Sequence, residues 1–338
     1  MRLIYSSILL TLLSLTIFSQ TDRDAAWKLA SEGRFGEASV LYEKVIAVNP
    51  DDPLALSNLS WCYLELKRYK DAESLARRAI ARDPRNAMSY NNLGYALFMQ
   101  ESYDAALDPL RTSIKLDDTF EKSRANLINT LLKLDRLDES ITELKSIIAI
   151  YPKKTSYRQK LAGILLQNEL FIEAIAALEE LNKLEPFRAN TFSMLGVAFA
   201  STGQSPKALE AFRRASVLEP DNINHLKNYA FALSMEGKQT ESIAVFHQIL
   251  AKNPKDFDSV FGIAMGYRDL GQLDAALNFG RQALALRPAS GQAMMFLAMT
   301  FVSKGDIESA RQFLPKLTEL NPKDAAILEK ALNNPKKP

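Results

Sequence analysis

Apolar residues in this chain recur in pairs of short segments, and the clearest example is residues 189–222. The first segment carries apolar or small residues at i, i+3, i+4 and i+7, which is one face of a helix: Phe192, Leu195, Gly196 and Phe199. The second carries them at i, i+4 and i+7: Ala208, Phe212 and Ala215. The pattern predicts two amphipathic helices, with small residues where the helices approach each other.

Residues that break or start helices separate the two segments. Gly203 interrupts the first helix, Ser205 can cap the second, and Pro206 suits the first helical turn, where a missing N–H costs nothing. Pro220 ends the second helix. The unit is therefore a helix-turn-helix of 34 residues.

The same unit fills most of the chain. Steps of 34 residues from Pro220 meet proline at eight of nine positions: Pro50, Pro84, Asp118, Pro152, Pro186, Pro220, Pro254, Pro288 and Pro322. Nine repeats then begin at 19, 53, 87, 121, 155, 189, 223, 257 and 291. A helix of about a dozen residues is marginal alone in water, so neighbouring repeats must stack to bury their apolar faces.

This arrangement resembles the tetratricopeptide repeat (TPR) family across residues 19–322. The resemblance rests on the bulky, small and aromatic positions of residues 189–222 and on the terminal proline. It implies an all-α, right-handed superhelical α-solenoid of about nine helix-turn-helix units. Residues 323–338 are expected to supply a capping helix and a tail, because Leu328, Ala331 and Leu332 share one helical face.

The fourth repeat departs most from the pattern. It has Arg124, Ile128 and Ser140 where the other repeats favour bulky, small and small residues. Proline also falls inside two second helices, at Pro109 and Pro315, where a kink is expected. We expect the array to be least regular between residues 105 and 150. Either a flexible joint or a local repacking would fit.

Composition and charge exclude several classes of function. The 338 residues carry 42 basic and 40 acidic side chains, which gives no electrostatic case for nucleic acid. Two histidines and one cysteine do not supply a common Cys/His metal cluster, and no phosphate loop or nucleophile motif is recognisable. We therefore predict a protein that is not an enzyme, with no cofactor, no catalytic residue and no small-molecule substrate.

Residues 1–19 form a separate segment. Arg2 precedes sixteen residues without a charge, which are followed by Ser19, a small residue suited to cleavage. This pattern predicts a signal peptide and an exported protein, in the periplasm or cell envelope. The alternative is an uncleaved N-terminal helix over residues 3–18 that anchors the protein to a membrane.

One row of residues on the first helices points away from the packing face and is nevertheless apolar. The ninth residues of the nine repeats are Trp27, Trp61, Tyr95, Asn129, Gly163, Val197, Phe231, Met265 and Met299. An exposed apolar row indicates an interaction surface. The alternative is a purely structural role, in which these side chains pack partly against neighbouring repeats. In the family, the same positions line a concave groove that holds peptides or helices.

The sixth residues add a polar row, with Asn58, Asn92 and Asn126 in consecutive repeats and Lys160 in the next. An asparagine side chain offers both a donor and an acceptor to a peptide backbone. The candidate groove residues are thus Trp27, Asn58, Trp61, Asn92, Tyr95, Asn126, Asn129, Lys160, Phe231, Met265 and Met299. Between its apolar blocks the groove turns polar and basic, at Lys122, Asn129, Lys133, Gln159, Lys160 and Gln167. One interpretation is an ordinary solvated helix face. If these lysines bind a ligand, they favour an acidic segment flanked by apolar anchors.

The sequence therefore predicts a non-enzymatic scaffold for protein–protein interaction that binds a peptide or helix of a partner. The alternative is a structural subunit of an envelope or membrane-associated assembly, which would use its convex face or an N-terminal anchor. An adaptor for a separate enzyme is indistinguishable from the first hypothesis at this level.

Overall fold

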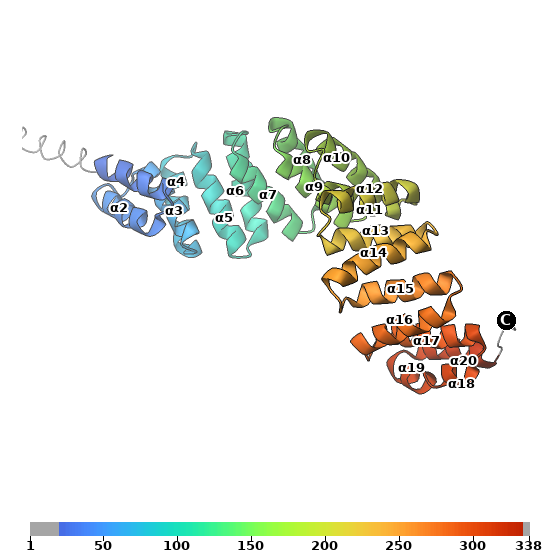
Figure 1. Ribbon diagram of the computed structural model, residues 1–338. Coiled ribbons are helices and arrows are strands. Elements are labelled where there is room, and N and C mark those ends of the chain that lie inside the picture. Colours follow the sequence, from blue (N-terminus) through green and yellow to red (C-terminus); the bar gives the residue numbers. More distant parts are fainter. Residues whose placement is uncertain (1–19, 334–338) are drawn as a thin grey trace, which may run out of the picture. The chain divides into compact units, whose positions relative to one another are not determined.

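The computed structural model describes residues 20–333, and these residues form helices joined by short turns, with no strand (Figure 1). The first helix of the first repeat covers 20–31. The first helices of the later repeats are α3 (Pro53–Glu65), α5 (Ala87–Met99), α7 (Glu121–Lys133), α9 (Thr155–Gln167), α11 (Ala189–Ser201), α13 (Ile223–Met235), α15 (Phe257–Asp269) and α17 (Gly291–Lys304).

The second helices follow after short turns. They are α2 (Phe35–Val48), α4 (Tyr69–Arg82), α6 (Tyr103–Leu116), α8 (Leu137–Ile150), α10 (Phe171–Leu184), α12 (Ser205–Leu218), α14 (Gln239–Lys252) and α16 (Leu273–Leu286), and in the last repeat α18 (Ile307–Arg311) with α19 (Leu314–Leu320). A final helix, α20 (Pro322–Asn333), packs on α17. The predicted fold class, an all-helical solenoid of consecutive helix-turn-helix pairs, is confirmed.

The turn within each repeat uses one left-handed residue. Glycine occupies this position with a positive φ in five repeats: Gly33, Gly203, Gly237, Gly271 and Gly305. The other four repeats force a residue with a side chain into the same conformation: Lys67, Glu101, Asp135 and Glu169, with φ between 56° and 62°. The geometry of the turn is thus set by the helix pair, and glycine only makes it easier.

Small residues allow the two helices of a unit to approach closely. A Cβ atom built on Gly196 in α11 would lie 2.5 Å from the ring of Phe212 in α12. Ala208, at the matching position of α12, is 2% exposed. The helices therefore cross at the positions that the sequence pattern reserves for small residues.

Helix caps occur mainly at the first helices. Asp52 accepts hydrogen bonds from the backbone N–H groups of Leu54 and Ala55, both at 3.0 Å, with Pro53 in the first turn of α3. The expectation that Ser205 caps α12 is wrong. The cap residue is Gln204, which makes no side-chain cap, and Ser205 is the first residue of the helix.

The expected irregularity between 105 and 150 is not seen in the helices. α6 runs through Pro109 without interruption, and α6, α7 and α8 have 14, 13 and 14 residues, like their counterparts in other repeats. The broken helix lies in the last repeat, where α18 ends at Arg311 and α19 begins just before Pro315. Proline at the start of a new helix loses no hydrogen bond.

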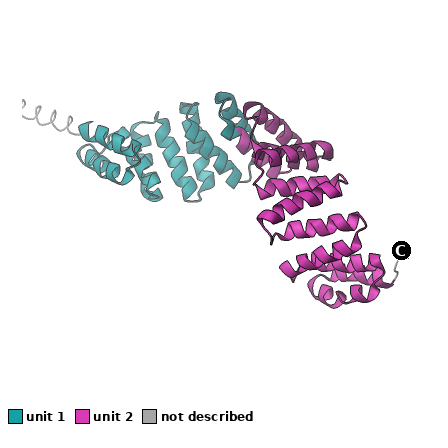
Figure 2. Ribbon diagram, in the orientation of Figure 1, with its two compact units in different colours: residues 1–157 teal, residues 158–338 magenta. Residues whose placement is uncertain are grey.

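The chain divides into two compact units after Tyr157 (Figure 2). Within each unit, helices pack on their neighbours in the chain, and first helices also pack on the first helices of adjacent repeats. Each core is a run of clusters along the array, as expected when every repeat contacts only its neighbours.

The structure bears on the membrane question only within residues 20–333. None of the helices it describes there combines the length and hydropathy that a membrane span requires. The proposed signal peptide or anchor, residues 1–19, lies outside the described residues.

Candidate functional site

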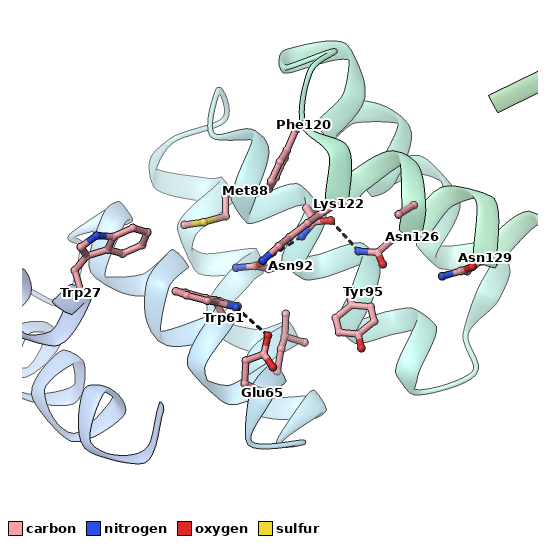
Figure 3. A pocket seen from close by; sticks show the side chains of 13 residues that line it. Trp27, Trp61, Glu65, Met88, Asn92, Tyr95, Phe120, Lys122, Asn126 and Asn129 are labelled. Atoms are coloured by element: carbon pink, nitrogen blue, oxygen red, sulfur yellow. Dashed lines mark hydrogen bonds between the residues drawn. The ribbon is translucent and has the colours of Figure 1, made fainter. Parts of the chain in front are cut away.

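An open pocket of about 500 Å³ lies in the first unit (Figure 3). The first helices of four consecutive repeats form it, which are the helix at 20–31, α3, α5 and α7. Its lining residues are Trp27, Trp61, Leu64, Glu65, Met88, Asn91, Asn92, Tyr95, Phe120, Lys122, Ala125, Asn126 and Asn129. Because equivalent residues of stacked repeats fall side by side, residues 34 apart in sequence meet on one wall.

The apolar wall consists of aromatic side chains. The ring centroids of Trp27 and Trp61 lie 5.9 Å apart with the planes at 49°, and Phe35 meets Trp61 edge-on at 5.3 Å. Trp27 is 49% exposed, whereas Trp61 and Tyr95 are half-buried. Aromatic surface that remains open to water in a folded chain is typical of binding sites.

Trp61 is held from two sides. Its indole N–H donates a hydrogen bond to the carboxylate of Glu65, one turn later on α3, at 3.1 Å. The ammonium of Lys122 lies 5.4 Å from the centre of the ring. These contacts fix the orientation of the indole within the wall.

The polar floor is a chain of asparagine amides that crosses three repeats. Asn126 donates to the side-chain oxygen of Asn91 at 2.9 Å, Asn91 to that of Asn92 at 3.5 Å, and Asn92 to the backbone oxygen of Ser57 at 3.0 Å. Ser123 adds a further donor to Asn91 at 3.3 Å. Asn92 and Asn126 are thus each oriented by a group of the preceding repeat, and Asn91 by its neighbour Asn92.

This chain sets what the floor can offer to a ligand. The nitrogen of Asn126 points to Asn91, so its oxygen is turned away from Asn91 and can accept a hydrogen bond (Figure 3). Asn92 is only 2% exposed, and its side-chain nitrogen already donates to the backbone oxygen of Ser57. Little of its side chain is therefore accessible to a ligand. The asparagine row therefore also links the repeats together, in addition to any contact with a ligand.

Six of the residues selected from the sequence meet in this pocket: Trp27, Trp61, Asn92, Tyr95, Asn126 and Asn129. Asn58 does not line it and is 8% exposed, with a buried side-chain oxygen that has no hydrogen-bond partner. Lys160 belongs to the second unit, where burial lowers the pKa of its ammonium. Burial also raises the pKa of the Tyr95 phenol, so Tyr95 serves the pocket as a neutral side chain.

Phe231 lines a different pocket of about 240 Å³ in the second unit, together with Val197, Asn228 and Met235. Its walls are mainly apolar, and Met235 is 76% exposed. The two remaining candidates, Met265 and Met299, are half-buried and pack against the core of the last repeats. These two methionines therefore have the structural role of partial packing against neighbouring repeats.

Seven lining residues are absent from the list of candidate groove residues: Leu64, Glu65, Met88, Asn91, Phe120, Lys122 and Ala125. Asn91 and Glu65 occupy helix positions that point away from the packing face, so the angular pattern that selected Trp61 could have found them. Phe120 lies in the turn before α7, outside any helical pattern, and no sequence signal marked it.

The groups that line the pocket are aromatic and amide side chains with few charges. Within residues 20–333 no group of three or more His, Cys, Asp or Glu side chains is placed to hold a metal ion. What the pocket presents is aromatic surface, oriented amides, one lysine and one glutamate. Such a set suits a peptide segment with apolar side chains.

The fold and the pocket define a class of protein, the helical repeat arrays that carry a groove on their first helices. Sequence profiles identify the family within this class. Two profiles described as tetratricopeptide repeat match residues 29–92 and 267–332, and 160–223, together more than half of the chain. A third profile, described as anaphase-promoting complex, cyclosome, subunit 3, matches residues 65–147. The chain belongs to the tetratricopeptide repeat family, whose members generally act as non-enzymatic scaffolds for protein interaction.

Two solved structures show the same fold at low sequence identity. The C-terminal part of a TPR repeat-containing protein from Cytophaga hutchinsonii has a TM-score of 0.64 and 14% identity, over 71% of this chain and 99% of that one. The complex of Naa15 and Naa10 bound to HypK-THB has a TM-score of 0.53 and 13% identity, over 93% of this chain and 65% of that one. MamA from Desulfovibrio magneticus RS-1 has a TM-score of 0.48 and 20% identity, over 50% and 96%. No curated protein matches the sequence.

Proposed function

We propose that this protein is a non-enzymatic scaffold that binds a peptide segment of a partner protein in the pocket of its first unit. One observation carries the proposal. Both tryptophans of the chain, Tyr95 and a chain of oriented asparagine amides line one open pocket. The remaining fixed elements, Glu65 and Lys122, hold Trp61 in place.

The expected affinity is modest. Burying one aromatic side chain of a ligand contributes about 1.5–3 kcal/mol, and each hydrogen bond to an amide about 0.5–1.5 kcal/mol. After the cost of ordering the ligand, a few such contacts support binding of roughly micromolar strength. This strength suits a scaffold that exchanges partners.

The test is a pull-down with the full chain from native soluble and membrane fractions. The variant Trp61→Ala/Asn126→Ala removes the wall and one amide of the pocket. The control Phe187→Ala removes an aromatic side chain that is 83% exposed in the second unit. Helicity of all proteins is checked first by far-UV circular dichroism.

We expect one partner to be lost with the pocket variant and kept with the control. Partners that remain bound to the pocket variant at wild-type levels would overturn the proposal. An assembly role that uses another face would then be the better account.

We also propose that the protein is exported, as the pattern of residues 1–19 indicates. Mass spectrometry of the protein from its native source tests this. A mature N-terminus at Gln20 supports export with cleavage, whereas an intact Met1 in the membrane fraction supports the anchored alternative.

A further inference from the structure

The groove wall formed by α7 differs from the walls formed by α3 and α5. Four residues at i, i+4, i+7 and i+11 place one polar, basic stripe along α7: Lys122, Asn126, Asn129 and Lys133. At the repeat position of Asn129, α3 carries Trp61 and α5 carries Tyr95. The pocket therefore has an aromatic side and a cationic side.

The ammonium of Lys122 lacks an acidic partner. Lys122 is exposed, and its contact with the ring of Trp61 at 5.4 Å is not accompanied by an ion pair with any residue in 20–333. Lys133, at the other end of the stripe, is also exposed and forms no ion pair within these residues. Lys154 of the same unit, in contrast, pairs with Glu121. Lys122 thus lines the pocket without an acidic partner, and Lys133 lies exposed further along the same face of α7.

The one carboxylate in the lining, Glu65, forms no ion pair with Lys122. Glu65 already accepts the hydrogen bond of the Trp61 indole at 3.1 Å. A basic side chain placed beside the Trp61 ring would be repelled by Lys122, which lies 5.4 Å from the ring centre. An acidic ligand can pair with Lys122 where it stands.

The short distance between Lys122 and the Trp61 ring determines how far apart the acidic and apolar residues of the ligand can be. The Lys122 ammonium lies 5.4 Å from the ring against which an apolar side chain would pack. In an extended peptide, residues i and i+2 lie on the same side at about 6.6–6.8 Å. An acidic residue two positions from the apolar anchor therefore reaches Lys122.

We propose that the pocket selects a peptide segment with an aromatic or large apolar residue followed two positions later by an acidic residue. The apolar side chain packs against Trp27 and Trp61, and the carboxylate pairs with Lys122. This inference rests on the proposed function and adds the chemistry of the partner segment.

Both tryptophans of the chain lie in this pocket, so tryptophan emission reports on it directly. The probes are four blocked peptides without tryptophan: Ac-Gly-Phe-Glu-Glu-Gly-NH2, the same peptide with Gln-Gln or with Lys-Lys in place of Glu-Glu, and the Glu-Glu peptide with Gly in place of Phe. Each is titrated to millimolar concentration against wild type, Lys122→Glu and the control Lys115→Glu. Lys115 is exposed on the second helix α6, so the control makes the same charge change outside the pocket.

We expect the Glu-Glu peptide to bind wild type about three- to fivefold more tightly than the Gln-Gln peptide, with the Lys-Lys peptide weakest of the three that carry phenylalanine. Lys122→Glu should reverse this order, and Lys115→Glu should preserve it. The preference should fade at about 1 M salt, where the screening length falls to about 3 Å. The peptide without phenylalanine should bind most weakly to every protein that keeps Trp61.

The outcomes separate the two proposals. Equal binding of the Glu-Glu, Gln-Gln and Lys-Lys peptides, with loss of all three in Trp61→Ala, would leave the proposed function standing and remove the acidic preference. Tightest binding of the Lys-Lys peptide to wild type would also overturn the preference and identify a site for cations. No change of tryptophan emission with any peptide would overturn both.

Discussion

Arg124 in α7 and Glu143 in α8 form an ion pair of 2.8 Å at a site where the repeat pattern expects a bulky apolar residue. The Arg124 side chain is 12% exposed, and its Nε also donates to the backbone oxygen of Asp118 at 3.2 Å. Asp118 stands where the other repeats have their terminal proline. The two departures from the pattern, Arg124 and Asp118, are therefore linked. Arg124 connects the turn before α7 to α8 through its contacts with Asp118 and Glu143.

This pair predicts a non-additive effect on stability. Glu143→Ala leaves a largely buried guanidinium without its acid and should lower the free energy of unfolding by about 1–3 kcal/mol. The double variant Arg124→Leu/Glu143→Leu should recover most of this loss, because apolar residues can pack at both positions. Urea unfolding followed by circular dichroism measures both. A neutral Glu143→Ala would show that the pair contributes nothing.

The left-handed turn position predicts stabilising substitutions. Glu101 has a φ of 62°, a conformation that is unfavourable for a residue with a Cβ atom. Glu101→Gly should therefore raise the free energy of unfolding by about 0.5–1 kcal/mol. Asp135→Gly should gain less, because aspartate tolerates this conformation better than glutamate does.

The comparison of these two variants is its own control, because both remove an acidic side chain from the same repeat position. Thermal unfolding of each variant against wild type measures the gain. A decrease in stability for Glu101→Gly would show that the side chain contributes more than its backbone strain costs.

Two glycines within first helices should respond to alanine with opposite signs. At Gly196 a new Cβ atom would lie 2.5 Å from the ring of Phe212, so Gly196→Ala should destabilise the protein by about 1–3 kcal/mol. At Gly163 nothing lies within 4 Å, so Gly163→Ala should stabilise α9 by up to about 1 kcal/mol through helix propensity. Midpoints of urea unfolding distinguish the two. Equal signs would contradict the assigned close approach of α11 and α12.

Cys62 is expected to be unreactive in the folded protein. It is fully buried in α3, and burial raises the pKa of its thiol to about 12. The reactive thiolate is therefore scarce below that pH. A thiol reagent at about pH 8 should label the unfolded chain fully and the native chain only as fast as the protein opens. Rapid labelling of native protein would mean that α3 opens locally.

The repeat period by itself determined the fold class. A 34-residue spacing of small, bulky and proline positions can be satisfied only by paired helices that bury their faces against their neighbours. The same spacing brought Trp27, Trp61 and Tyr95 onto one wall, because equivalent residues of stacked repeats must lie side by side. Contacts between equivalent residues of adjacent repeats follow from the repeat spacing, so they can be predicted from the sequence.

Tertiary structure alone decided which members of the predicted rows face a ligand. Asn92 and Asn126 could equally have pointed to solvent or to the preceding repeat, and their hydrogen bonds to Ser57 and Asn91 settled the matter. Met265 packs on the core while Phe231 lines a pocket, although both occupy the same repeat position. Phe120 entered the first pocket from a turn. Side-chain direction depends on partners from several repeats at once, and a helical period carries no information about them.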